Sequence, residues 1–163
     1  MTGIEERALL RDYLETCERL RQGLERAAEQ VEPFLPIAAA ELDRIAIGDE
    51  NHILAYLKRF EQFEDALGRT LKTLAQIMAL GKIERLQPRD VANRAEAFGI
   101  VESADRWADA VRIRNALAHE YPLRPDKRAD QVNNAWHART TLLETWAGIL
   151  SFIDRELLLD DPS

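Results

Sequence analysis

Cysteine is almost absent from this chain of 163 residues, in which Cys17 is the only one. A single cysteine excludes an internal disulfide and the multi-cysteine ligand sets of structural zinc sites. Cys17 falls on the apolar stripe of the first expected helix, where we expect a small buried side chain. The sequence also lacks the zinc pattern H-E-x-x-H and clustered carboxylates, so it predicts chemistry without a metal ion or another cofactor.

Long apolar runs and nucleotide-binding loops are missing as well. No stretch of about 18 apolar residues occurs, and the first residues lack the basic and apolar sections of a signal peptide. We therefore expect a cytoplasmic protein that does not interact with a membrane. The loops G-x4-G-K-S/T and G-x-G-x-x-G are also missing, which excludes these two cradles for nucleotide phosphates.

Basic charge is scarce, and the formal net charge is −7. This balance argues against a protein that coats nucleic acid nonspecifically, because such binding depends on many Lys and Arg side chains. Residues 106–128 nevertheless contain six basic and three acidic residues, while the rest of the chain carries −10. We expect a small electropositive region there, suited to one or a few phosphates. Its basic residues are Arg106, Arg112, Arg114, Arg124, Lys127 and Arg128.

The sequence does contain a strong helical periodicity, and no credible strand. Apolar residues recur at spacings of three and four, and the length and 46% apolar content fit one domain spanning residues 1–163. Gly48 is expected in a left-handed cap, with Asp49 and Ser103 capping the helices that follow them. The sequence predicts an all-α antiparallel bundle of four long and two short helices. The expected helices span 4–31, 36–47, 50–80, 88–98, 103 to the Pro122 stop, and about 30 residues after a loop at 122–128.

The most informative segment lies at the end of the fifth expected helix. Residues 114–121 read Arg-Asn-Ala-Leu-Ala-His-Glu-Tyr and are followed by Pro122. They place a permanent cation, an amide, an imidazole and a phenol within about two helical turns. The arginine fork suits phosphate and histidine titrates near neutral pH, so Arg114 and His119 can hold a phosphodiester and move protons around it.

This R-N-x3-H-x-Y spacing at a helix end resembles the signature of HEPN-domain ribonucleases, most closely the HepT-like toxins encoded beside a minimal nucleotidyltransferase. The resemblance covers roughly residues 50–158. It implies a HEPN-like bundle and a homodimer in which both motifs line one cleft. It also implies a nucleotidyltransferase antitoxin that adds adenylate to the motif tyrosine, here Tyr121. Three further segments follow the family's order: Pro88-Arg89-Asp90, Phe98-Gly99-Ile100-Val101 and Ile113-Arg114-Asn115.

Helical geometry makes one copy of the motif incomplete. Five residues at about 100° each set His119 roughly 140° around the axis from Arg114, so the two flank a groove. Asn115 and His119, four residues apart, share a face. A second copy across a twofold axis would complete a phosphate site. The residue before a proline avoids the α conformation, so we expect Tyr121 to leave the helix and face solvent at the mouth of the cleft.

RNA is the expected substrate, because its 2′-hydroxyl is an internal nucleophile that DNA lacks. His119 would act as general base or acid, and Arg114 would stabilise charge on the phosphoryl oxygens. Asn115 would orient His119 or the ribose, and a 2′,3′-cyclic phosphate product would follow.

Two charged residues, Glu64 and Arg139, interrupt the apolar stripes of their expected helices. Because an unpaired buried charge is costly, we expect Glu64 to pair either with Arg139 or with Arg114.

The main hypothesis is a metal-independent endoribonuclease, the toxin of a two-gene toxin–antitoxin system, restrained by its nucleotidyltransferase partner. The chief alternative is a noncatalytic helical subunit that binds substrate for, or docks on, a nucleotidyltransferase. A third is a helical scaffold whose R-x4-H is accidental. In these alternatives Arg114 would only pair with a carboxylate, and His119 would only cap the carbonyl end of its helix. His52 is expected at the surface, and His137 at the margin of the last helix, outside a site.

Overall fold

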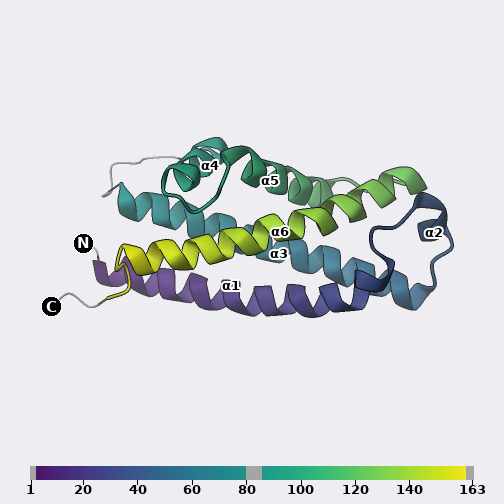
Figure 1. Ribbon diagram of the computed structural model, residues 1–163, viewed down its shortest axis with the longest axis horizontal. Coiled ribbons are helices and arrows are strands. Elements are labelled where there is room, and N and C mark those ends of the chain that lie inside the picture. Colours follow the sequence, from purple (N-terminus) through teal and green to yellow (C-terminus); the bar gives the residue numbers. More distant parts are fainter. Residues whose placement is uncertain (1–2, 80–85, 161–163) are drawn as a thin grey trace.

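The computed structural model describes residues 3–79 and 86–160, and all regular structure in these ranges is helical (Figure 1). The long helices α1, α3, α5 and α6 pack together, with α2 and α4 as the short ones, which confirms the predicted all-α class. Consecutive long helices run antiparallel. The helices are α1 (Gly3–Val31), α2 (Ala39–Asp43), α3 (Ile47–Met78), α4 (Pro88–Ala97), α5 (Ala104–His119) and α6 (Pro125–Arg155), with a 3-10 turn at Glu32–Phe34.

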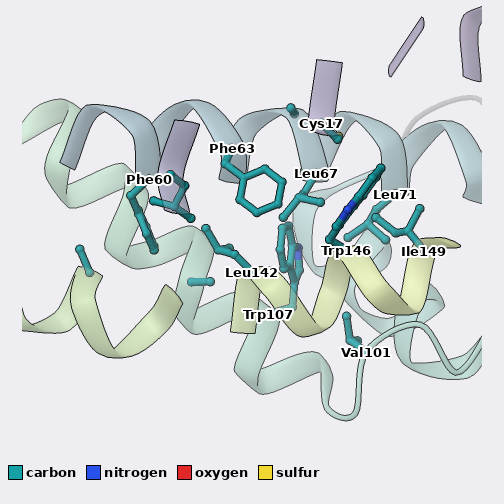
Figure 2. Close-up of a cluster of buried hydrophobic side chains, with 14 of the residues drawn as sticks. Cys17, Phe60, Phe63, Leu67, Leu71, Val101, Trp107, Leu142, Trp146 and Ile149 are labelled. Atoms are coloured by element: carbon teal, nitrogen blue, oxygen red, sulfur yellow. The ribbon is translucent and has the colours of Figure 1, made fainter. Parts of the chain in front are cut away.

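Helix α3 is the centre of the bundle, because it packs against α1, α4, α5 and α6. Figure 2 shows its Phe63 and Leu67 meeting Trp107 of α5, Trp146 of α6 and Cys17 of α1 in one apolar cluster. The Cys17 thiol is buried, lies 3.4 Å from the Thr70 hydroxyl and has its pKa raised by burial. Cys17 is therefore a core residue, as its position on the apolar stripe predicted.

The segment between α1 and α3 differs from the prediction. The expected helix over 36–47 shortens to α2, because the side chain of Asn133 on α6 bonds both the N–H and the C=O of Ile37, each at 2.8 Å. Ala46 then takes the extended N-cap position of α3, so Gly48 and Asp49 lie inside the first helical turn. The prediction of a left-handed Gly48 and a capping Asp49 was wrong. The Asp49 charge instead lies near the positive end of the helix dipole.

A tight turn between α4 and α5 sets the start of the motif helix. Gly99 has a φ of 74°, and the N–H of Ile100 bonds the carbonyl of Ala95 at 2.9 Å, which closes a Schellman cap. The Ser103 hydroxyl then accepts from the N–H groups of Asp105 and Arg106. The predicted Ser103 cap is confirmed.

Helix α6 crosses this turn closely. A Cβ built on Gly148 would overlap the carbonyl oxygen of Ile100, so only glycine allows the observed approach of the two backbones. Within the ranges described here, no helix has a stretch long and apolar enough to cross a lipid bilayer.

Candidate functional site

Helix α5 carries the motif and ends where the sequence predicted. His119 is its last residue, Glu120 is extended, and Tyr121 lies outside the helix with 82% of its surface exposed. The side-chain amide of Gln131, on α6, approaches the carbonyls of Ala116 and Glu120 at 3.4 and 3.5 Å. Helix α6 thereby helps to satisfy the carbonyl end of α5, a contact with no signal in the sequence.

Arg114 is held at all three of its guanidinium nitrogens. Its Nε lies 3.2 Å from Oε2 of Glu64, and its Nη2 donates to Oδ1 of Asp65 at 2.8 Å. Its Nη1 donates to the side-chain oxygen of Asn115 at 2.9 Å. Both carboxylates come from α3, so the packing of α5 on α3 fixes the plane of the guanidinium. The side chain of Arg114 keeps 28% exposure.

The partner of Glu64 is therefore Arg114, one of the two predicted alternatives. The pairing with Arg139 is not found: the Arg139 guanidinium lies over the ring of Trp136, 3.8 Å from its centroid. A cation over an indole face is a stable arrangement for a half-buried arginine. Among the residues described, no carboxylate pairs with Arg139, and the ring of Trp136 supports its charge instead.

Glu64 is a buried acid with an unusual pKa. Its side chain is only 6% exposed, and this burial raises its pKa to about 7. The nearby charge of Arg114 opposes the rise, while that of Asp65 adds to it. Near neutral pH, Glu64 therefore exists in both protonation states, and the charge around Arg114 changes with them.

Asp65 is the site residue that the sequence analysis missed. It lies next to Glu64, just off the apolar stripe, and the residue one turn later is Arg69, so the local pattern indicates only a surface pair on one helix. The structure contains this pair, with Asp65 Oδ2 at 3.0 Å from Arg69 Nε. Its second contact, to Arg114, depends on how α5 lies on α3, which local spacing does not specify.

The sequence left two partners open for Asn115, the His119 ring or the ribose of the substrate, and the first of these contacts is not formed. The Asn115 oxygen accepts from Arg114, and among the described residues no hydrogen bond joins the Asn115 amide to the His119 ring. His119 is exposed at the end of α5. Arg114 contacts Glu64 and Asp65 of α3 instead, and no hydrogen bond joins Arg114 to His119 in the described part of the chain.

A groove of about 340 Å³ opens beside the end of α5. Leu54 and Leu57 of α3, Leu117 of α5 and the exposed Tyr121 and Leu123 line it, with Leu123 93% exposed. Both signs of charge stand at its margin, from Lys58, Arg128, Glu50, Glu61 and Glu120. Such an apolar groove with a mixed-charge margin is typical of an interface.

The electropositive region expected over residues 106–128 is largely neutralised. Arg106 pairs with Glu102 and Glu144, and Arg112 pairs with Asp109. Further along, Arg124 pairs with Asp126, and Arg128 lies 3.7 Å from Glu50. Glu50 of α3 and Glu144 of α6 lie outside this segment, so counting charges along the segment alone overestimated the positive potential.

No protein-family model, curated protein or solved structure matches this chain. The residues of the site itself therefore have to carry any functional assignment. In the described part of the chain, no three His, Cys, Asp or Glu side chains converge into a metal-binding group.

The arrangement combines one fixed group with one free group. Arg114 presents a guanidinium in a set orientation, a form suited to charge on phosphoryl oxygens. His119 presents an exposed imidazole, the side-chain type that general acid–base catalysis uses most often. The phenol of Tyr121 lies two residues further on, open to another protein.

Proposed function

We propose that this protein is a metal-independent endoribonuclease of the HEPN type, the toxin of a two-gene system. The observation that carries the proposal is the fixed orientation of Arg114, held at Nε, Nη1 and Nη2 on the same helix that ends in the exposed His119. Contacts at all three nitrogens fix the plane of this guanidinium, and an arginine held in a set plane with 28% of its side chain exposed suits recognition of a phosphodiester.

The reaction follows from RNA's own nucleophile. The 2′-oxygen attacks phosphorus while His119 takes the 2′-hydroxyl proton, and the bond from phosphorus to the 5′-oxygen breaks. His119 of the second copy gives a proton to the departing 5′-oxygen. Arg114 stabilises the negative charge that builds on the phosphoryl oxygens. The products are a 2′,3′-cyclic phosphate end and a 5′-hydroxyl end.

A homodimer supplies the second histidine. The groove beside α5 supports this part of the proposal, because its apolar lining and its two signs of charge are compatible with a self-complementary, twofold contact. Leu123 projects from the loop at its edge. In the proposed dimer, Leu123 of each copy contributes to covering the groove of the other.

The exposed Tyr121 is the proposed point of control. A nucleotidyltransferase partner would transfer adenylate to its hydroxyl oxygen, with pyrophosphate of ATP as the leaving group. The added phosphate would repel the RNA backbone at the entrance to the site. The exposure of Tyr121 supports this role, because a modifying enzyme has to reach the phenol.

One observation favours the noncatalytic alternative. Glu64 and Asp65 together can offset more than the single charge of Arg114, so the arginine has less attraction left for RNA. On this alternative, a nucleotidyltransferase binds in the groove beside Tyr121, and residues 114–121 form part of the binding surface without a catalytic role.

An RNA cleavage assay with the purified wild-type protein and a metal chelator distinguishes the nuclease from the noncatalytic subunit. The substrate is a short single-stranded RNA, with DNA of the same sequence as the control, since DNA has no 2′-hydroxyl. The proposal predicts RNA fragments with 2′,3′-cyclic phosphate ends by mass spectrometry and intact DNA. Intact RNA, or activity that needs a divalent ion, would contradict it.

A further inference from the structure

Asp65 lies between two arginines at the surface of the bundle. Its Oδ1 accepts from Nη2 of Arg114 at 2.8 Å, and its Oδ2 lies 3.0 Å from Nε of Arg69. The Asp65 side chain is 38% exposed and that of Arg69 is 65% exposed. One carboxylate therefore shares its two oxygens between a guanidinium of α5 and a guanidinium of α3, in contact with solvent.

Two guanidinium groups that converge on one oxyanion form a site that suits phosphate as well as carboxylate. Both anions offer oxygens to planar N–H donors, and charge-assisted bonds of this kind are short and strong. Asp65 thus occupies, with its own oxygens, the edge of Arg114 that a phosphodiester would use.

The two carboxylates on Arg114 differ in how easily an incoming anion can replace them. Glu64 is almost completely buried and contacts Nε, so it stays in place while Nη2 changes partner. Asp65 is partly exposed, and Arg69 can continue to hold it after it leaves Arg114. The protein therefore has a place to keep the displaced carboxylate, at the cost of its partly buried ion pair with Arg114.

We propose that Asp65 is an internal competitor for phosphate: an RNA phosphodiester takes its place on Arg114, while Arg69 retains the carboxylate. This inference rests on the proposed function and adds the step by which a neutralised Arg114 becomes available. Asp65 is a gating residue that lowers affinity for RNA, and Arg69 acts through it. Neither residue takes part in the chemistry.

The test is a binding measurement that needs no catalysis. The probe is a fluorescent single-stranded RNA with 2′-O-methyl groups at every position, which has no free 2′-hydroxyl and cannot be cleaved. Asp65→Asn keeps the size of the side chain and removes its charge. We expect it to bind about fivefold more tightly than wild type, equivalent to about 1 kcal/mol, by fluorescence anisotropy at fixed ionic strength.

Asp109→Asn is the matched control. Asp109 pairs with Arg112 on α5, is also exposed, and its removal changes the net charge of the protein by the same amount. We expect this control to change affinity by less than about twofold, because a separate exposed charge is screened by salt. Inorganic phosphate, added as a competitor, should displace the probe from Asp65→Asn at a lower concentration than from wild type.

Two double variants identify the route. In an Arg114→Gln background, Asp65→Asn should raise the affinity for the probe no more than Asp109→Asn does. The guanidinium for which Asp65 and phosphate compete is then absent. Arg69→Gln alone should weaken binding of the probe, because Asp65 then pairs only with Arg114. The same change should have a smaller effect in a protein that already carries Asp65→Asn. Thermal unfolding checks each fold, and Asp65→Ser serves as a second variant if the asparagine protein does not fold.

Several results would overturn the inference. They are an Asp65→Asn affinity no higher than that of Asp109→Asn, a gain that persists without Arg114, or no binding of the probe by any variant. These outcomes are separable from failure of the proposed function. A wild-type protein that cleaves RNA while Asp65→Asn binds normally would contradict only the gating role. Tighter binding by Asp65→Asn without any cleavage would contradict only the nuclease.

Discussion

Arg114 of α5 and Glu64 of α3 form an ion pair in which the carboxylate is almost completely buried, with Nε and Oε2 3.2 Å apart. Removal of either partner leaves the other with an unsatisfied group, and a buried charge without a partner is costly. Because Glu64 can bind a proton, loss of Arg114 costs less at low pH than at high pH. Every functional variant at Arg114 therefore needs its stability measured at the pH of the assay.

The first prediction concerns the pH dependence of stability. The pKa of Glu64 is raised to about 7, against 4.5 for an ordinary glutamate. Between these values the folded protein holds this proton and the unfolded chain does not, so this group makes the free energy of unfolding fall as pH rises from about 4.5 to about 7. Each unit of pKa difference is worth about 1.4 kcal/mol.

Glu64→Gln should remove this dependence, because an amide does not titrate. Urea unfolding at intervals from pH 5 to pH 8 measures it, as the difference in slope between wild type and variant. Parallel curves for the two proteins would show that Glu64 is not the group responsible.

The second prediction concerns the close contact between α6 and the turn before α5. Gly148→Ala should destabilise the protein by about 1–3 kcal/mol or more, because the added methyl group meets the Ile100 carbonyl and one backbone has to move. Gly48→Ala is the matched control, since nothing lies within 4 Å of its added Cβ in the first turn of α3. The control should be neutral or stabilise by up to about 1 kcal/mol. Equal urea midpoints for both variants would contradict the observed helix packing.

The third prediction concerns assembly. The wild-type protein should sediment as a dimer, and Leu123→Glu should shift it toward monomer and reduce cleavage, because the charge enters the proposed contact. Ile4→Glu changes an exposed apolar residue at the start of α1 and should keep the dimer. A wild-type monomer at micromolar concentration that still cleaves RNA would rule out the composite site.

The fourth prediction concerns Tyr121. On the proposed function, co-expression with a nucleotidyltransferase partner should add adenylate to the peptide containing Tyr121 and silence cleavage. The buried Tyr56, whose hydroxyl donates to the Ala135 carbonyl at 2.9 Å, should stay unmodified. Tyr121→Phe should keep much of the cleavage and resist silencing. If the partner binds without modifying the protein, and the free protein shows no cleavage, the noncatalytic module is the better account.

Much of the fold follows from local patterns in the sequence. The apolar stripe of α3, the Ser103 cap and the proline stop at Pro122 depend on residues within one helix or its end, so the sequence alone predicted them. The segment 36–47 depends on the side chain of Asn133, almost a hundred residues away, and its helix was predicted too long for that reason.

The candidate site divides in the same way. Glu64 was predicted to need a basic partner because a charge interrupted an apolar stripe, and Arg114 was one of two candidates. Asp65 carried no such signal, since an acid beside the stripe with an arginine one turn later is an ordinary surface pattern. Its bond to Arg114 is set by the rotation of α5 against α3, which the spacing within either helix does not determine.

The most direct test of the central claim is the rate of RNA cleavage by His119→Ala in the presence of a metal chelator. His137→Ala, an exposed histidine of α6, and Arg112→Gln, an exposed arginine of α5, are the matched controls. The account predicts a loss of at least about 100-fold for His119→Ala, and also for Arg114→Gln, with both controls at the wild-type rate and all four variants folded. Cleavage at the wild-type rate by the folded His119→Ala protein would contradict it.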